Sequence, residues 1–266
     1  DVYQFLSRMG IAMEQKPFAV GVRIEHPQAL INISQYGMDY HAKLGAADYQ
    51  LTYKDEVTGR GAYTFCMCPG GHVVAASSEQ EGLVTNGMSE YARDSGIANS
   101  ALVVTVNKED FDGNHPLAGM EYQRFWEKRA FKAGGENYYA PVQGVRDFLC
   151  HNTKKNMEIK SSYLPATISS DLHRVLPSYV GDVMERALKY FDSRIKGFAG
   201  EQAVLTGIET RTSSPVRILR SDSGESVNLS GLYPSGEGSG YAGGIISSAV
   251  DGMRSAEKIM QKYLPV

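Results

Sequence analysis

Cysteine is scarce in this chain, with three residues among 266. Three cysteines cannot all pair, and they are too few to staple a chain of this length, so we expect a reducing, cytoplasmic setting. The sequence also lacks any apolar run near the roughly 20 residues needed to cross a bilayer. Its N-terminus has no basic flank followed by an apolar core, so we expect that these residues are not a signal peptide. We therefore expect no membrane partner.

The sequence also lacks an excess of positive charge. The net charge is −3 and no basic run occurs, which argues against a nucleic-acid partner. The sequence contains no G-x-x-x-x-G-K-[ST], no G-x-S-x-G and no H-E-x-x-H, so a P-loop, a nucleophile elbow and this type of zinc protease site are not expected. With 42% hydrophobic and 21% charged residues, the composition is that of a globular protein with a sizeable core.

Short strands dominate the sequence pattern. In residues 18–25, Phe18, Val20, Val22 and Ile24 alternate, which predicts a half-buried strand that stops at Pro27. Turn-forming residues separate a run of further short strands, typical of a meander rather than a βαβ array. The expected strands cover residues 49–53, 62–67, 72–76, 83–85, 102–106, 205–209, 216–219 and 227–233.

Helical periodicity marks four segments. Val2, Phe5, Leu6 and Met9 recur at helical spacing between a candidate N-cap, Asp1, and a candidate terminating glycine, Gly10. Such an abrupt start suggests a piece of a longer protein. The other expected helices cover residues 121–132, 180–195 and 245–260. The mixture predicts an α+β fold with a mixed or antiparallel sheet.

A glycine-rich turn lies between the expected strand at 227–233 and the last helix. Residues 238–243 spell G-x-G-x-x-G, which is found in dinucleotide-binding turns but also in turns that only need close packing. Too little chain follows it for a complete dinucleotide fold. However, Glu237 can accept hydrogen bonds from sugar hydroxyls, and Gly243 to Ile246 offer backbone amides at a helix N-terminus. Such amides suit an anion or an electron-rich ring.

The stretch GLYPSGEGSGYAGGIISSAVDG, residues 231–252, resembles the C-terminal flavin motif of two-dinucleotide-binding-domain flavoproteins. Within that superfamily the chain resembles the bacterial FAD-utilizing dehydrogenases. The matching blocks are KPFAVGVRIEHPQALINISQYG at 16–37, YTFCMCPGGHVVAASSE at 63–79, NSALVVTV at 99–106 and LTGIETRTSSPVRILR at 205–220.

In that family the pyrophosphate-binding glycine motif lies near the start of a longer chain, and this sequence lacks it. The resemblance therefore implies a C-terminal portion with three parts. Residues 1–16 would be a helix of the remaining FAD domain, 17–200 an inserted substrate or cap domain, and 201–266 the last strands and helix of an incomplete Rossmann-like FAD-binding domain.

The function implied by this resemblance is that of an FAD-dependent oxidoreductase, a dehydrogenase of unknown substrate. Its partners would be a small-molecule substrate and a nicotinamide or other electron donor or acceptor. The truncated chain is expected to bind FAD weakly or not at all, and to self-associate. The alternative is a non-catalytic nucleotide-binding or interaction module. The expected flavin contacts are Gly236, Glu237, Gly238, Gly243, Gly244, Ile245 and Ile246.

Catalytic candidates are fewer. Arg211 and Ser213 suit the substrate side of a flavin, although a hydrogen-bonded loop explains them equally well. His26 is a candidate proton donor, against the alternative of a hydrogen-bonded surface histidine. Cys66 and Cys68 would share a strand face, as a redox pair or as two half-buried thiols. With His72 they fall short of zinc-ligand spacing, so no metal site is expected.

Overall fold

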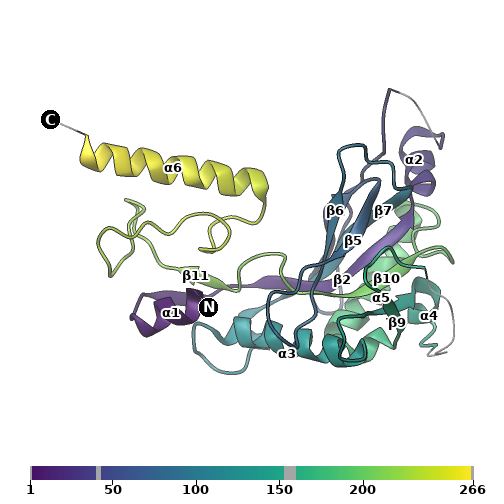
Figure 1. The fold of residues 1–266 in the computed structure, drawn as a ribbon, viewed down its shortest axis with the longest axis horizontal. Coiled ribbons are helices and arrows are strands. Elements are labelled where there is room, and N and C mark those ends of the chain that lie inside the picture. The colour runs from purple at the N-terminus through teal and green to yellow at the C-terminus, as the bar shows by residue number, and fades with distance from the viewer. Residues whose placement is uncertain (1, 40–42, 153–159, 265–266) are drawn as a thin grey trace. The chain divides into compact units, whose positions relative to one another are not determined.

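The computed structural model describes residues 2–39, 43–152 and 160–264, which form two compact units (Figure 1). Unit 1 combines residues 1–19, 106–123 and 211–266, and unit 2 combines residues 20–105 and 124–210. Unit 1 thus includes residues 106–123, which the sequence analysis assigned to the inserted domain. Residues 201–210, which the sequence analysis assigned to the FAD-domain remainder, lie in unit 2. No helix among the described residues is long and apolar enough to cross a membrane.

A seven-stranded sheet forms the centre of unit 2 (Figure 1). Its registered pairs are antiparallel except for the last two strands, which run parallel. The order is β3 (Thr52–Lys54), β4 (Gly61–Cys68), β7 (Ile97–Val106), β2 (Phe18–Pro27), β10 (Val204–Glu209), β8 (Ala140–Gly144) and β9 (Thr167–Ser169). The mixed α/β architecture with a mainly antiparallel sheet agrees with the predicted class.

The predicted meander is correct only in its hairpins. β3 pairs with β4, and β5 (Gly71–Ala75) pairs with β6 (Thr85–Ser89) in a separate two-stranded sheet. β4 then pairs with β7 rather than with β5. Turn residues mark where strands end, but they do not fix which non-local strands pair, so the sequence could not supply this order.

Strand β2 is buried on both faces, which corrects the half-buried strand expected from alternation. It lies between β7 and β10 in the middle of the sheet. Gly21 permits this packing, because a Cβ there would lie 1.9 Å from the carbonyl oxygen of Leu102 on β7. A central strand covered on both sides needs no polar face, and its hidden polar residues then need partners within the protein.

Helices cover unit 2 and connect its strands. The predicted stripe of α5 (Ser178–Arg194) is confirmed: its residues from Val180 to Phe191 at helical spacing are buried, and the helix packs against β3 and β4. The sequence analysis missed the shorter helices, which carry too few turns for a clear period. These are α2 (Gln28–Tyr36), α4 (Val145–Leu149) and the 3₁₀ turn η2 (Leu172–Arg174).

Unit 1 has a small core. β1 (Met13–Gln15) pairs antiparallel with β11 (Val216–Ile218), and Val216 packs with Leu117 and Met120. Met120 lies in the first turn of α3 (Ala118–Ala133), and Leu117 directly precedes this helix. The remaining elements are α1 (Val2–Arg8), the 3₁₀ turn η1 (Lys108–Asp110) and α6 (Ile245–Tyr263).

Two predictions concern the residues that begin and end α1 and the strand expected before α6. Gly10 terminates α1 with φ +74°, as expected, whereas Asp1 lies outside the described residues. The strand expected at 227–233 is wrong: no strand forms there, and only an isolated bridge joins Arg220 to Ser226. The Asn228 side chain instead forms hydrogen bonds with the α1–β1 loop. It accepts one from the Ala12 amide and donates one to the Gly10 carbonyl. Side-chain bonds of this kind compete with strand pairing.

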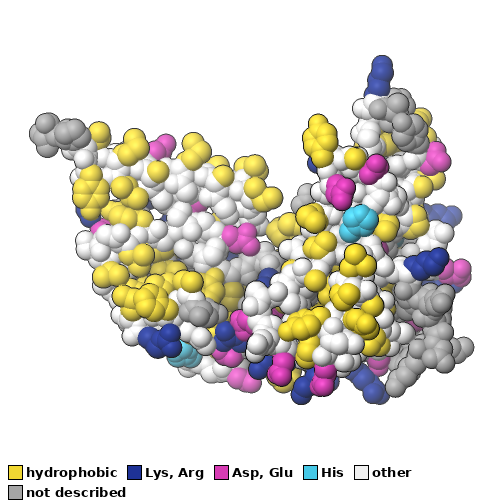
Figure 2. Space-filling view, viewed as in Figure 1, with side chains coloured by type: hydrophobic (Ala, Val, Ile, Leu, Met, Phe, Trp, Pro, Cys, Tyr) yellow, Lys and Arg dark blue, Asp and Glu magenta, His cyan; other side chains and the backbone are white. Residues whose placement is uncertain are grey.

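Two helices of unit 1 expose their apolar faces. In α1, Val2 and Phe5 are 69% and 54% exposed. Apolar side chains also line the exposed surface of α6 (Figure 2). They are Ile245, Ile246, Val250, Met253, Met260 and Tyr263. Exposed apolar surface of this kind marks contact regions in proteins.

A fully buried guanidinium lies at the centre of unit 2. Arg23 of β2 donates to Asn99 Oδ1 at 2.5 Å and to the carbonyl of Cys66 at 3.0 Å. Its Nη1 lies 3.6 Å from Oε2 of Glu209 on β10. Gly87 on β6 makes room, because a Cβ there would lie 1.9 Å from Arg23 Nη2. Burial raises the pKa of Glu209 to about 7, and the nearby Arg23 opposes that rise.

We expect Arg23→Met to destabilise the protein by about 3–5 kcal/mol, because it leaves Glu209 buried without its cation. The double variant Arg23→Met/Glu209→Met removes both polar groups and should lose less stability. Urea unfolding of the three proteins measures the difference. A double variant as unstable as the single one would show that the pair is not coupled.

The raised pKa of Glu209 also predicts a pH dependence of stability. The folded protein binds the proton of Glu209 more tightly than the unfolded chain does. This group therefore stabilises the folded protein fully below its usual pKa of 4.5, and the contribution is lost as the pH rises through about 7. Glu209→Gln should therefore flatten the stability profile between these values. Glu201→Gln, which changes an exposed carboxylate, is the control and should keep the wild-type slope.

Candidate functional site

The glycine segment, residues 236–244, is anchored to α6 by an ion pair in unit 1. Asp251 on α6 accepts from both Arg220 amino groups, at 2.6 and 2.9 Å, and from the Gly236 amide at 2.8 Å. The Arg220 hydrogen bonds are the main cause that lowers the pKa of Asp251 to about 2. Asp251 is thus ionised near neutral pH and fixes the start of the segment against the helix.

The N-terminus of α6 is open. Its N-cap is Gly244, and no side chain caps the first turn. Ile245 and Ile246 are 85% and 76% exposed, and a Cβ added at Gly243 would meet no atom within 4 Å. Uncapped first-turn amides and the helix dipole make such an end a donor array for negative or electron-rich groups.

Glu237 lies in a polar cluster with Lys16 and Tyr3. Its carboxylate accepts no hydrogen bond from the residues that the structure describes, and Lys16 is the cation acting on it. Tyr3 donates to the carbonyl of Gly238 at 2.7 Å and lies 2.9 Å from Ser214 Oγ. The cluster therefore combines an unused acceptor with an ammonium group beside the glycine segment.

The pKa values of Glu237 and Lys16 move toward each other. Burial raises the pKa of Glu237, and Lys16 partly offsets this rise. Burial also lowers the pKa of Lys16, with a further decrease from Arg217 and an opposing effect of Glu237. A carboxyl group and an amine shifted in this way suit proton transfer better than their unperturbed forms do.

The substrate-side candidates lie in the same unit, with different surroundings. Ser213 Oγ is 3.5 Å from Lys16 Nζ, so the structure brings Ser213 to the polar cluster. Arg211 is exposed. The roles given to both residues stay predictions.

His26 lies in the core of unit 2, so the interpretation of His26 as a hydrogen-bonded surface residue is wrong. The residue is 2% exposed, its ring centroid lies 4.4 Å from that of Phe198, and its Nε2 is hydrogen-bonded to the Phe198 carbonyl at 2.8 Å. Burial lowers the pKa of His26 to about 4, with the Phe198 carbonyl opposing. Burial thus favours the neutral imidazole near neutral pH, and the role of His26 as a proton donor stays a prediction.

Cys66 and Cys68 do not share a strand face, contrary to expectation. β4 shifts register between Phe65 and Cys68, and Cys66 has φ +43°. A bulge inserts an extra residue and breaks the two-residue alternation. Cys66 is exposed, whereas Cys68 is half-buried with Sγ 3.7 Å from Arg23 Nη2. Neither cysteine forms a disulfide within the part of the chain that the structure describes.

Two members of the polar cluster, Lys16 and Tyr3, escaped the sequence analysis. Each is more than 200 positions from the glycine segment in the chain, and neither belongs to a motif. The β1–β11 pairing brings these distant segments together. The one usable signal was the position of Lys16 at the start of the first matching block.

Replacing Lys16 with Met should raise the pKa of Glu237 further, because the variant removes the cation that favours the carboxylate. Carboxyl carbon shifts measured by NMR as a function of pH report this value. Lys108→Met removes another unit 1 lysine, paired with Glu14 at 4.0 Å, and serves as the control. An unchanged Glu237 titration in Lys16→Met would contradict the proposed electrostatic coupling.

Known proteins identify the family. Residues 17–212 match the family described as FAD-dependent protein, C-terminal domain-like. A protein of Clostridium beijerinckii (strain ATCC 51743 / NCIMB 8052), described as uncharacterized, is 56% identical over 265 residues. That match covers 99% of this chain and 50% of the relative, so the chain spans about half the relative's length. The chain belongs to the FAD-dependent protein, C-terminal domain-like family.

Proposed function

We propose that this chain is the C-terminal portion of an FAD-dependent oxidoreductase, a dehydrogenase acting on a small organic substrate. The observation that carries the proposal is the open amide end of α6 beside Glu237, whose carboxylate has no hydrogen-bond partner among the described residues. Family membership gives this arrangement a cofactor of matching chemistry.

The residues present fit the ring end of a flavin. The Ser248 hydroxyl, in the first turns of α6, is buried without a partner in the described part of the chain. A Cβ at Gly238 or Gly243 would meet no atom, which leaves room for a ring beside the backbone. Glycine, free amides and a free hydroxyl supply the close approach and the donors that a flat heteroaromatic ring requires.

When bound, the flavin would supply hydride transfer. Gly236, Glu237 and Gly238 would hold its polyol chain, with the Glu237 carboxylate accepting from hydroxyl groups. The amides from Gly243 to Ile246 would face the electron-rich edge of the ring and favour negative charge there. Lys16 adds a positive charge to the same cluster.

Unit 1 would be the remainder of a Rossmann-like FAD-binding domain. The exposed apolar faces of α1 and α6 support this assignment, because a complete domain buries such faces. The missing strands and the pyrophosphate-binding turn would lie in the additional half that longer relatives carry. A nicotinamide or another acceptor would exchange electrons with the flavin, and exposed faces of the truncated chain would favour self-association.

FAD titration tests the proposal, with visible absorption and quenching of flavin fluorescence as readouts. We expect tight binding by a form extended at its N-terminus and weak or no binding by residues 1–266. In the extended form, Glu237→Gln should weaken binding at least about tenfold, since hydrogen bonds to charged groups are worth about 1.5–3 kcal/mol. Glu257→Gln, an exposed carboxylate on the same helix, is the matched control.

Two outcomes would contradict the proposal. If neither form binds FAD, the proposed flavin site does not exist. Bound flavin that neither nicotinamides nor organic substrates reduce under anaerobic conditions would favour the alternative, a non-catalytic nucleotide-binding or interaction module.

A further inference from the structure

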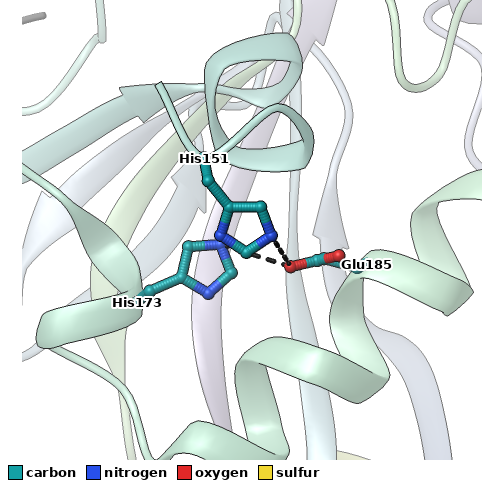
Figure 3. A group of neighbouring side chains, drawn as sticks. All are labelled: His151, His173 and Glu185. Atoms are coloured by element: carbon teal, nitrogen blue, oxygen red, sulfur yellow. Dashed lines mark ion pairs between the residues drawn. The ribbon is translucent and has the colours of Figure 1, made fainter. Parts of the chain in front are cut away.

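Three potential metal ligands converge in unit 2, in a group that the glycine segment does not involve (Figure 3). They are His151, which follows α4, His173 of η2 and Glu185 of α5. Their ligand atoms all lie within 4.8 Å of one another. Both imidazoles point a nitrogen at the same carboxylate oxygen, Oε1 of Glu185 (Figure 3).

The spacing matches a tetrahedral metal site. The Nε2 atoms of His151 and His173 lie 3.0 and 3.4 Å from Glu185 Oε1. Metal–ligand bonds of about 2.0–2.2 Å at tetrahedral angles separate two ligand atoms by roughly 3.3–3.6 Å. The two histidine–carboxylate distances therefore need little adjustment to hold an ion.

The fold fixes two of these ligands. The His173 ring stacks on Phe148 with centroids 4.1 Å apart and planes 4° from parallel. Gly181 on α5 leaves the space, because a Cβ there would lie 2.9 Å from His173 Nδ1. The side chains of His173 and Glu185 are 18% and 17% exposed. Rotamers held by packing reduce the entropy lost when an ion binds.

The third ligand lies on the solvent-exposed side of the site. The His151 side chain is 64% exposed, and its ring stacks on His173 with centroids 4.4 Å apart. An exposed imidazole can rotate toward an ion, and it leaves the remaining coordination position open to water. His173 Nε2 also lies 3.1 Å from the Phe148 carbonyl, which accepts from the His151 amide as well. That carbonyl keeps a donor when a metal replaces the Nε2 proton.

We propose that His151, His173 and Glu185 bind a divalent transition-metal ion of the zinc type with an open coordination position. Two imidazoles and one carboxylate are a common ligand set for Zn²⁺. Cations that prefer oxygen ligands, such as Ca²⁺, do not favour this set. The ion would connect the segment after α4, η2 and α5.

Zinc titration of the metal-stripped chain tests this site by calorimetry or by competition with a chromophoric chelator. We expect one Zn²⁺ per chain, and at least about tenfold weaker binding in His151→Ala and in Glu185→Gln, since each loses one of three ligands. Because His151 is exposed, its variant should fold normally. Zinc should also raise the thermal unfolding midpoint of the wild type but not of these variants.

Two control variants make the result specific. His72→Ala removes an exposed histidine on β5, and Cys150→Ser removes the exposed thiol next to His151 in the chain. Both should bind zinc like the wild type. Absence of stoichiometric binding, undiminished binding in His151→Ala and Glu185→Gln, or loss of binding in Cys150→Ser or His72→Ala would each overturn the proposal.

Discussion

The buried guanidinium of Arg23 constrains much of unit 2. It lies on the central strand β2 and takes partners from the strands on either side, Asn99 on β7 and Glu209 on β10. A buried cation tolerates few arrangements, because nearby polar and charged groups must offset the free-energy cost of removing it from water. The glycine at position 87 and the irregular backbone at Cys66 both serve it: the first makes space and the second supplies a carbonyl acceptor.

Unit 1 is organised differently. Its core is small, and the exposed faces of α1 and α6 leave much apolar surface in solvent. Specific polar contacts hold the glycine segment instead, above all Asp251 with Arg220 and the Gly236 amide. The helix end that we assign to the flavin is thus fixed on one side and open on the other, which suits a site whose remaining walls come from another part of a longer protein.

Strongly periodic segments were predictable from the sequence, whereas spatial neighbours were not. The stripe of α5 and the strand ending at Pro27 follow local rules. The burial of β2 on both faces, the bulge in β4 and the placement of His26 depend on non-local packing. The strand expected at 227–233 failed because Asn228 bonds a loop from the other end of the chain. The His151–His173–Glu185 group likewise depends on contacts between distant segments, and Lys16 was marked only by its position at the start of a matching block.

The central claim is that the flavin binds at residues 236–246, with its polyol chain at Glu237 and its ring at the N-terminus of α6. A crystal structure of the N-terminally extended protein with FAD tests it most directly. The account predicts the isoalloxazine at the N-terminus of α6, with Glu237 within hydrogen-bonding distance of the polyol chain. A flavin bound elsewhere, with the α6 amides facing solvent, would contradict it.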